Sequence, residues 1–354
     1  MDQRWQSLGH LLVHHSMQVQ PNEKVLITMR EAHTLPLVRA VYEACIRADA
    51  YPQVQFLSDT LDHSLLRYGT PQQIERLPDL EALGMEWADV NFALRGTHNL
   101  YEFSDIPNAV LASYRKTMGK VSSLRWEKTR WSIVRVPNED FAQQAETDYE
   151  TILDMFFDGC LRDWPTEAQR WQAIADRLNA GTQVHVVAPG TDLRFSTQNR
   201  KWLVADGRNN LPDGEIFTAP DHTTVDGVIS FEWPGVLGGR LVPGLRLEWK
   251  QGKLINASAS QNEDFLQTIL ASDEGATAIG EFAFGVNYGI NRFCKDIFFD
   301  EKIGGTIHIA LGRAYPLCGG TNQSAIHWDI IKDLRQAGAV YLDGRKVFEN
   351  GAFI

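Results

Sequence analysis

The first half of the sequence alternates between short apolar runs and longer stretches with helical periodicity, and this alternation restricts the fold more than any other feature. Residues 24–29 form an apolar run typical of a buried strand, and residues 35–50 then repeat their apolar side chains with a helical period. Strands that alternate with helices in this way predict a parallel sheet covered by helices. The later segments of the alternation are residues 51–57, 78–87, 89–94, 107–118 and 131–136.

The second half has a different sequence pattern, in which many short strand-like runs are separated by turn residues. Residues 182–196 have the pattern of a hairpin, and Gln251-Gly252 and Asp343-Gly344 are turn dipeptides between apolar runs. One helix is expected at residues 263–272. This half therefore predicts an α+β arrangement with mostly antiparallel strands.

A helical stretch connects the two halves. Residues 138–180 have a helical pattern, and Pro165 is expected to divide them into two helices. Because 354 residues exceed what one hydrophobic core usually serves, we expect two domains. These are an α/β domain with a parallel-type sheet over residues 1–180 and an α+β, mostly antiparallel domain over residues 181–354.

Composition and charge exclude several classes of partner. The chain has 45 acidic and 34 basic residues and a formal net charge of -11, which repels nucleic-acid phosphates and anionic membrane surfaces. The four cysteines have no paired spacing, as expected for reduced thiols. There is neither a signal-like start nor an apolar run of about 18 residues that could span a membrane. We therefore expect a cytoplasmic protein that binds neither nucleic acid nor membranes.

Two carboxylates of the second half stand in unusual settings. Glu215 follows a Pro-Asp-Gly turn directly, and Glu281 interrupts the apolar run AIGEFAFGV. A buried carboxylate must be paired, protonated or bound to a metal ion, because its desolvation is otherwise costly. A surface acid beside a turn would also explain Glu215, and a partner Arg or Lys would explain Glu281.

Two histidines and one further carboxylate lie in strand-like runs nearer the C-terminus. His308 stands in TIHIALG, with Tyr315 shortly after it, and His327 and Asp329 are two residues apart in IHWDII. Residues two apart on a strand point to the same face, so His327 and Asp329 can aim at one metal ion. A core histidine and a simple His–Asp hydrogen bond are the corresponding structural alternatives.

Taken together, these positions offer three carboxylates, two histidines and one tyrosine. Two divalent ions need about this many oxygen and nitrogen ligands when one carboxylate bridges them. The six residues are Glu215, Glu281, His308, Tyr315, His327 and Asp329.

The motifs around these residues resemble those of the thermophilic aminopeptidase family, the aminopeptidase T group of metallopeptidases. The resemblance lies in NLPDGEIFTAP, GEFAFG, TIHIALG followed by a tyrosine, and SAIHWDII, which occur here in the same order. It extends from about Gly181 to the C-terminal DGRKVFENGAF. The first half matches more loosely, through its α/β pattern and the segment DYETIL.

The resemblance implies that the second domain is the metal-binding catalytic domain. It implies two divalent ions per subunit (zinc, cobalt or manganese), a bridging role for Glu215, and a place near the metals for Tyr315 as a ligand or an assisting hydroxyl. It also implies a homodimer that acts on short peptides with a free N-terminus. The metal ligands that it implies are Glu215, Glu281, His308, Tyr315, His327 and Asp329.

The leading hypothesis is an aminopeptidase that hydrolyses the N-terminal amide bond through a water held by the two metal ions. Glu281 is the candidate to accept the water proton, and Tyr315 is the candidate to donate a hydrogen bond to the tetrahedral intermediate. The catalytic residues in this hypothesis are thus Glu281 and Tyr315.

Three other functions stay open. Only residues 316–326 separate the tyrosine motif from the His-x-Asp motif, fewer than is usual in the family, so a small-molecule amide hydrolase on the same scaffold is one alternative. A ring-cleaving dioxygenase is a second alternative, because dihydroxypyridine dioxygenases are similarly compact relatives. In that case this chain would hold one Fe(II) through His327, Asp329 and a third group. A non-catalytic binding module would require lost ligands, and none is missing.

Overall fold

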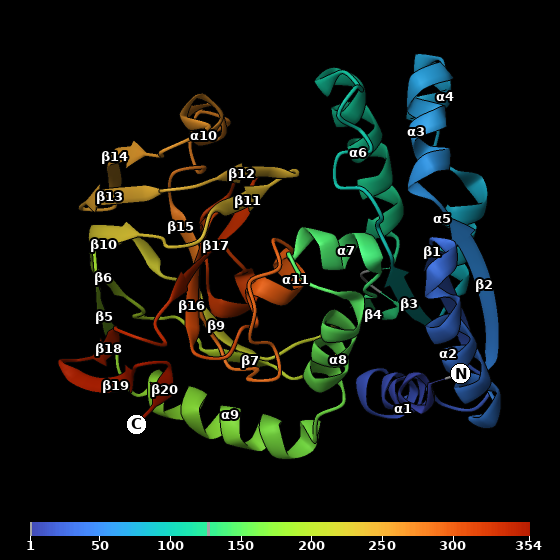
Figure 1. Ribbon diagram of the computed structural model, residues 1–354, viewed down its shortest axis with the longest axis horizontal. Coiled ribbons are helices and arrows are strands. Elements are labelled where there is room, and N and C mark those ends of the chain that lie inside the picture. The colour runs from blue at the N-terminus through green and yellow to red at the C-terminus, as the bar shows by residue number, and fades with distance from the viewer. Residues whose placement is uncertain (1, 126–127) are drawn as a thin grey trace. The chain divides into compact units, whose positions relative to one another are not determined.

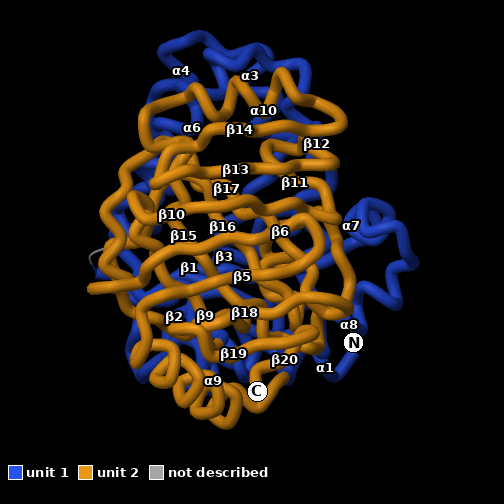
Figure 2. Tube along the Cα trace, turned by 90° about the vertical axis from the view of Figure 1, so that its left-hand side faces the viewer, with its two compact units in different colours: residues 1–161, 207–212 blue, residues 162–206, 213–354 orange. Residues whose placement is uncertain are grey.

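The computed structural model describes residues 2–125 and 128–354 (Figure 1). The chain forms two compact units (Figure 2): unit 1 comprises Met1–Leu161 and Gly207–Pro212, and unit 2 comprises Arg162–Asp206 and Asp213–Ile354. The domain boundary expected at residue 180 stays a prediction. The division into compact units falls between Leu161 and Arg162 in the chain. The short segment Gly207–Pro212 returns to unit 1 because it adds a strand to the sheet there.

Unit 1 is built on a five-stranded parallel sheet, as the alternating pattern predicts. The strand order is β2–β1–β3–β4–β8, and each neighbouring pair is parallel. The central strands are buried on both faces, which explains their continuous apolar runs. The strands are β1 (Lys24–Arg30), β2 (Tyr51–Leu57), β3 (Val90–Arg95), β4 (Arg130–Arg135) and β8 (Asn210–Leu211).

Helices connect these strands. α2 buries the apolar face that the periodicity predicts, including Leu37, Val41 and Cys45. The helices of unit 1 are α1 (Gln3–Leu11), α2 (Leu35–Arg47), α3 (Asp59–Tyr68), α4 (Pro71–Glu75), α5 (Asp79–Trp87), α6 (Asn108–Ser123), α7 (Glu139–Gln144) and α8 (Tyr149–Cys160).

The stretch 138–180 contains three helices where the sequence analysis expects two. Besides α7 and α8 it holds α9 (Trp164–Asn179), which belongs to unit 2. The physical reason is capping. The side chains of Asn138, Asp148 and Asp163 each accept a hydrogen bond from a backbone N–H three residues later, and each starts a new helix. Pro165 lies in the first turn of α9, where a proline is tolerated.

Unit 2 contains two larger antiparallel sheets, as expected for an α+β domain. One has eight strands in the order β14–β13–β10–β6–β5–β18–β19–β20, and the other has five in the order β17–β16–β15–β9–β7. The strands of the eight-stranded sheet are β5 (Gln183–Ala188), β6 (Thr191–Ser196), β10 (Asp221–Ser230), β13 (Arg246–Lys250), β14 (Lys253–Ser258), β18 (Ala339–Leu342), β19 (Arg345–Glu349) and β20 (Ala352–Phe353). The five-stranded sheet consists of β7 (Leu203–Ala205), β9 (Glu215–Thr218), β15 (Ile279–Gly285), β16 (Thr306–Gly312) and β17 (His327–Asp333). The remaining elements are the hairpin β11 (Gly235–Leu237) and β12 (Arg240–Val242) and the helices α9, α10 (Glu263–Leu270) and α11 (Ile297–Asp300).

Aromatic side chains join the two sheets of unit 2. Phe282 of β15 packs against Phe195 of β6 with ring centroids 5.0 Å apart, and Phe284 of β15 packs against Phe348 of β19 at 5.1 Å. Because side chains alternate along a strand, the residues between these phenylalanines face the other way. The five-stranded sheet therefore has one face in the core and one face available for a site.

Two predicted turns are confirmed in unit 2. Gln251 and Gly252 have φ values of 48° and 75°, and Asp343 and Gly344 have φ values of 49° and 78°. Positive φ at both central residues is the conformation that two-residue hairpin turns favour. All four cysteines are buried, and none of them forms a disulfide. In the described ranges no helix combines the length and apolar character needed to cross a membrane.

Candidate metal centre

Five of the six predicted site residues project from one face of the five-stranded sheet. Glu215 comes from β9, Glu281 from β15, His308 from β16, and His327 and Asp329 from β17. The strand register brings them together, because residues directly opposite in an antiparallel pair share a face. Ala310 of β16, for example, lies opposite both Glu281 and Asp329.

Small residues make room between these side chains. Each of the five has an alanine or a glycine as its cross-strand partner on at least one neighbouring strand. The sheet therefore surrounds its polar cluster with positions that contribute almost no side-chain volume. The partners are Gly285 for Glu215, Ala310 for Glu281 and Asp329, Ala283 for His308, and Gly312 for His327.

The functional atoms converge. The His308 Nε2 atom lies 3.5 Å from Glu215 Oε2, 3.8 Å from Glu281 Oε1 and 4.0 Å from Asp329 Oδ1. The His327 Nε2 atom lies 3.2 Å from Glu281 Oε2 and 3.4 Å from Asp329 Oδ1. Such separations suit nitrogen and oxygen atoms that share a cation, since each would lie about 2.0–2.2 Å from the ion.

Two buried atoms at the centre point to the same conclusion. Glu215 Oε2 and His308 Nε2 are inaccessible to solvent and have no hydrogen-bond partner in the part of the chain that the structure describes. Buried polar atoms are normally satisfied, so an orphaned pair facing each other needs an explanation. A divalent cation between them would satisfy both, and the residues present therefore fit a metal ion.

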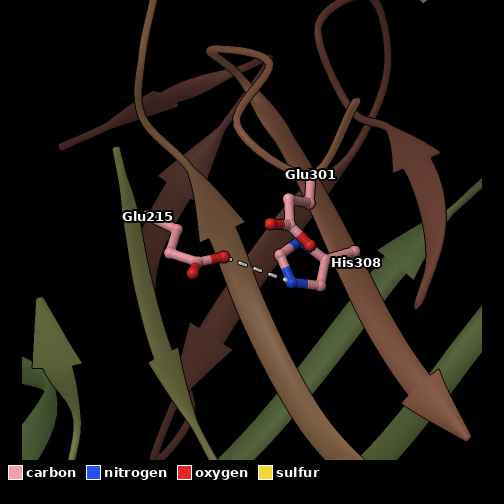
Figure 3. Close-up of side chains that lie close together, drawn as sticks. All are labelled: Glu215, Glu301 and His308. Carbon is pink, nitrogen blue, oxygen red and sulfur yellow. Dashed lines mark ion pairs between the residues drawn. The ribbon is translucent and has the colours of Figure 1, made fainter. Parts of the chain in front are cut away.

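The potential ligands form two groups of three. One consists of Glu215, Glu301 and His308 (Figure 3), and the other consists of Glu281, His327 and Asp329; within each group one ligand atom per residue lies within 4.8 Å of the others. Carboxylates and neutral imidazoles are ligands that zinc, cobalt and manganese accept. Two such groups, formed by the sheet face and the turn after α11, can hold two divalent ions.

The sequence analysis missed Glu301 and its neighbour Lys302, which follow the short helix α11. The Lys302 Nζ atom lies 2.7 Å from Glu215 Oε1 and 2.7 Å from Glu301 Oε1. One sequence signal could have revealed them, since these charges stand between the apolar Phe298-Phe299 pair and Ile303. Three consecutive charged residues are, however, more typical of an exposed turn.

The crowding of carboxylates raises the pKa values of several groups. Burial, reinforced by Glu301 and Glu281 against the opposing Lys302, raises the pKa of Glu215 to about 8. Burial disfavours a charge on His308, but Glu281, Glu215 and Asp329 outweigh it and raise the pKa of that imidazole to about 9. These shifts describe a strongly negative environment, which favours a cation.

His327 has a defined orientation. Its Nδ1 atom lies 2.8 Å from the carbonyl oxygen of Arg313, to which it can donate a hydrogen bond. That bond fixes the ring orientation and directs Nε2 at Glu281 and Asp329, where a bound metal ion would take the place of the Nε2 proton. Metal-binding histidines are usually held in this way.

Tyr315 lies beyond the end of β16 and is not on the sheet face. Its ring packs against the imidazole of His327 with centroids 5.0 Å apart. Burial and the carboxylates of Glu281 and Asp329 raise the pKa of its phenol, which therefore stays protonated and can donate a hydrogen bond. The centre thus brings all six predicted residues into one neighbourhood.

Comparison with known proteins agrees with the resemblance in the motifs. The model of the thermophilic metalloprotease (M29) family matches residues 1–353. The chain therefore belongs to this family of metalloproteases, and the predicted relationship to the aminopeptidase T group is confirmed.

Named relatives cover the chain to different extents. Aminopeptidase PepS from Streptococcus thermophilus is 25% identical over 401 residues, which covers 97% of this chain and 96% of the relative. Aminopeptidase T from Thermus thermophilus is 32% identical over 262 residues, which covers 62% of this chain and 63% of the relative.

Two solved structures share the fold along nearly the whole chain. Wild-type AmpT from Thermus thermophilus has a TM-score of 0.85 at 23% identity and covers 99% of both chains. The 2,5-dihydroxypyridine dioxygenase from Pseudomonas putida KT2440 has a TM-score of 0.62 at 14% identity, with 99% of this chain and 96% of that chain covered. At these identities the likeness shows the fold alone.

Proposed function

We propose that the chain hydrolyses the N-terminal amide bond of short peptides at a centre of two divalent metal ions on the face of the five-stranded sheet that carries the ligands. Membership of the M29 family makes the chain a metal-dependent hydrolase of the aminopeptidase class. The observation that carries the dinuclear proposal is the pair of three-ligand groups formed by the five-stranded sheet and the turn after α11. Zinc, cobalt and manganese are the proposed metals.

The protein residues have separate roles in this proposal. Glu215, Glu301 and His308 would hold one ion, and Glu281, His327 and Asp329 would hold the other. Bound there, the ions would supply Lewis-acid polarisation of the amide carbonyl and would lower the pKa of a water molecule. The bridging role of Glu215 stays part of the proposal, since Glu215 Oε2 and Glu281 Oε1 of the other group lie 3.5 Å and 3.8 Å from the same His308 Nε2 atom.

Glu281 and Tyr315 are the proposed catalytic residues. Glu281 lies beside both histidines, and the proximity of His308 and His327 counteracts the effect of burial and lowers the pKa of its carboxyl. An ionised carboxylate can accept a proton from water and pass it to the leaving amine. The protonated phenol of Tyr315 would donate a hydrogen bond to the oxygen that becomes negative during the reaction.

The decisive experiment combines metal analysis with a substrate panel. We expect purified protein to contain divalent metal, to cleave aminoacyl-p-nitroanilides and short peptides, and to lose activity with a chelator. Peptides acetylated at the N-terminus should be poor substrates, because an aminopeptidase recognises the free amine. Full activity after complete metal removal would contradict the proposal, and equal cleavage of acetylated and free peptides would favour a general amide hydrolase.

We also propose that the protein acts as a cytoplasmic homodimer. The proposal is supported by the family resemblance of the motifs and by the four buried cysteines, which form no disulfide and so suit a reducing compartment. Light scattering of the purified chain should give twice the mass of 39.9 kDa.

A further inference from the structure

Lys302 is a fully buried cation inside the carboxylate cluster. Its side chain is 0% exposed, and its Nζ atom lies 2.7 Å from Glu215 Oε1, 2.7 Å from Glu301 Oε1 and 3.5 Å from Asp213 Oδ1. A buried ammonium is costly unless carboxylates surround it, and here three do. The lysine is therefore a fixed positive charge in the centre.

The main chain holds this lysine in place. The carbonyl oxygen of Lys302 accepts a hydrogen bond from Asn287 N at 3.1 Å, and the Asn287 side chain donates to the carbonyl oxygen of Asp213 at 2.6 Å. Gly304 N donates to the carbonyl oxygen of Asn287 at 3.0 Å. One asparagine thus links the segment that carries Lys302 to the segment that precedes Glu215.

Lys302 divides the oxygens of Glu215 between two partners. Oε1 contacts the ammonium, while Oε2 faces His308 Nε2 at 3.5 Å. The lysine therefore orients a potential metal ligand and at the same time competes with the metal ion for its negative charge.

The second ligand group has no such lysine. In the described ranges Glu281 and Asp329 form ion pairs only with His308 and His327. Lys302 also enters the charge balance of the centre. Two divalent ions and the ammonium of Lys302 together would balance the five negative charges of its carboxylates. Those carboxylates are Asp213, Glu215, Glu281, Glu301 and Asp329.

We propose that Lys302 makes the two metal positions unequal. The position formed by Glu215, Glu301 and His308 binds its divalent ion more weakly than the position formed by Glu281, His327 and Asp329, because the fixed ammonium repels a cation there. This inference rests on the proposed dinuclear centre. It assigns Lys302 a positioning role, with the tight metal retained and the other metal exchangeable.

The test is a calorimetric titration of metal-depleted full-length protein with Mn²⁺ and, separately, with Zn²⁺, in the presence of a competing chelator. Each class of metal position appears as one binding phase. Wild type should show two phases whose dissociation constants differ at least tenfold. Lys302→Met, which removes the charge and keeps the length, should tighten the weak phase at least tenfold, whereas Lys302→Arg should retain the gap. Lys332→Met is the matched control, because Lys332 is also 0% exposed but pairs with Glu232.

A second variant keeps the inference testable if Lys302→Met does not fold. Glu301→Gln should abolish or weaken the weak phase and leave the tight phase unchanged, whereas Asp329→Asn should remove the tight phase. Two equal phases in wild type, or a weak phase that Lys302→Met leaves unchanged or weakens, would overturn the role of Lys302 while leaving the dinuclear proposal intact. Binding of one ion or none in every variant would instead contradict the dinuclear centre itself.

Discussion

Each compact unit contains a histidine cluster, and the pKa values of the histidines are shifted in opposite directions in the two clusters. In unit 2, His308 and His327 face several carboxylates, and the carboxylates raise the pKa of His327 to about 11 despite burial. In unit 1, burial together with His98 and Arg135 lowers the pKa of His33 to about 4. Residue type alone therefore does not define a cation site.

The geometry of the two clusters explains this contrast. In unit 1 the contacts run in a line, from His33 Nδ1 to His98 Nε2 at 3.1 Å and from His98 Nδ1 to Asp140 Oδ2 at 2.6 Å. Only one carboxylate takes part in this histidine chain of His33, His98 and Asp140. In unit 2 the carboxylates converge from three strands, β9, β15 and β17, and from the turn after α11. Convergence of charge, not the presence of histidine, distinguishes the proposed metal centre.

The largest effect should come from removing a convergent ligand. His327→Ala and Asp329→Asn should each lower kcat/KM by more than roughly 100-fold, since even outer partners of metal ligands are worth about 10–100-fold. Metal content and aminoacyl-p-nitroanilide cleavage would be measured, with circular dichroism to verify folding. His185→Ala is the control, because His185 of unit 2 pairs with Asp192 on the other sheet. Retention of metal and activity in both ligand variants would remove the basis of the comparison.

The next effect should come from filling the space between the ligands. Ala310→Leu leaves every ligand in place but adds volume opposite Glu281 and Asp329, so we expect metal affinity to fall by about tenfold or more, in line with overpacking costs of about 1–3 kcal/mol. Ile309→Leu on the same strand is the volume-conserving control. Calorimetric titration would measure the change, and unaltered affinity in Ala310→Leu would show that the small residues do not matter.

In unit 1, a smaller effect should follow from crowding the histidine chain. A Cβ at Gly96 would lie 2.3 Å from His33 Cε1 and 2.4 Å from His33 Nε2, so Gly96→Ala must displace the imidazole. We expect the free energy of unfolding to fall by about 1–3 kcal/mol. Gly119→Ala in α6 is the control, because its Cβ would meet nothing within 4 Å. Equal stability of the two variants in urea denaturation would argue against close packing at Gly96.

The smallest effect concerns acid stability. His33 has a pKa of about 4 when folded, against about 6.5 when unfolded. Between these values the unfolded chain binds more protons, so the folded state loses stability as the pH falls. His33→Gln lacks this titrating group. Between pH 7 and pH 4.5 its free energy of unfolding should therefore fall by about 1–2 kcal/mol less than that of the wild type. Urea denaturation at both pH values measures the difference, and identical losses would mean that His33 is not held neutral by the fold.

Much of the fold was predictable from local patterns. The alternating pattern predicted four of the five parallel strands of unit 1, β1 to β4, but not the short β8. Turn dipeptides such as Asp343-Gly344 predicted hairpins of unit 2 because their backbone conformation is local. The number of helices in residues 138–180 was harder to predict, since each new helix depends on the capping geometry of one side chain, such as Asp148.

The candidate site was predictable to a similar degree. Glu281, His308 and Asp329 stand out as polar residues in apolar strands. Glu301 and Lys302 do not, because they lie in a charged turn that looks solvent-exposed in the sequence. Their burial against Glu215 depends on hydrogen bonds from Asn287, which is far from Glu215 in the chain.

By itself, the sequence determined the family through the resemblance of its motifs. It also determined the two kinds of sheet and the residue types that can bind a cation, because these depend on composition and short-range periodicity. Only the tertiary structure decided which charges meet. Strand register set Glu215, Glu281, His308 and Asp329 on one sheet face, and the turn after α11 added Lys302. Electrostatic energy depends on distances between atoms, and those distances exist only once distant strands have paired.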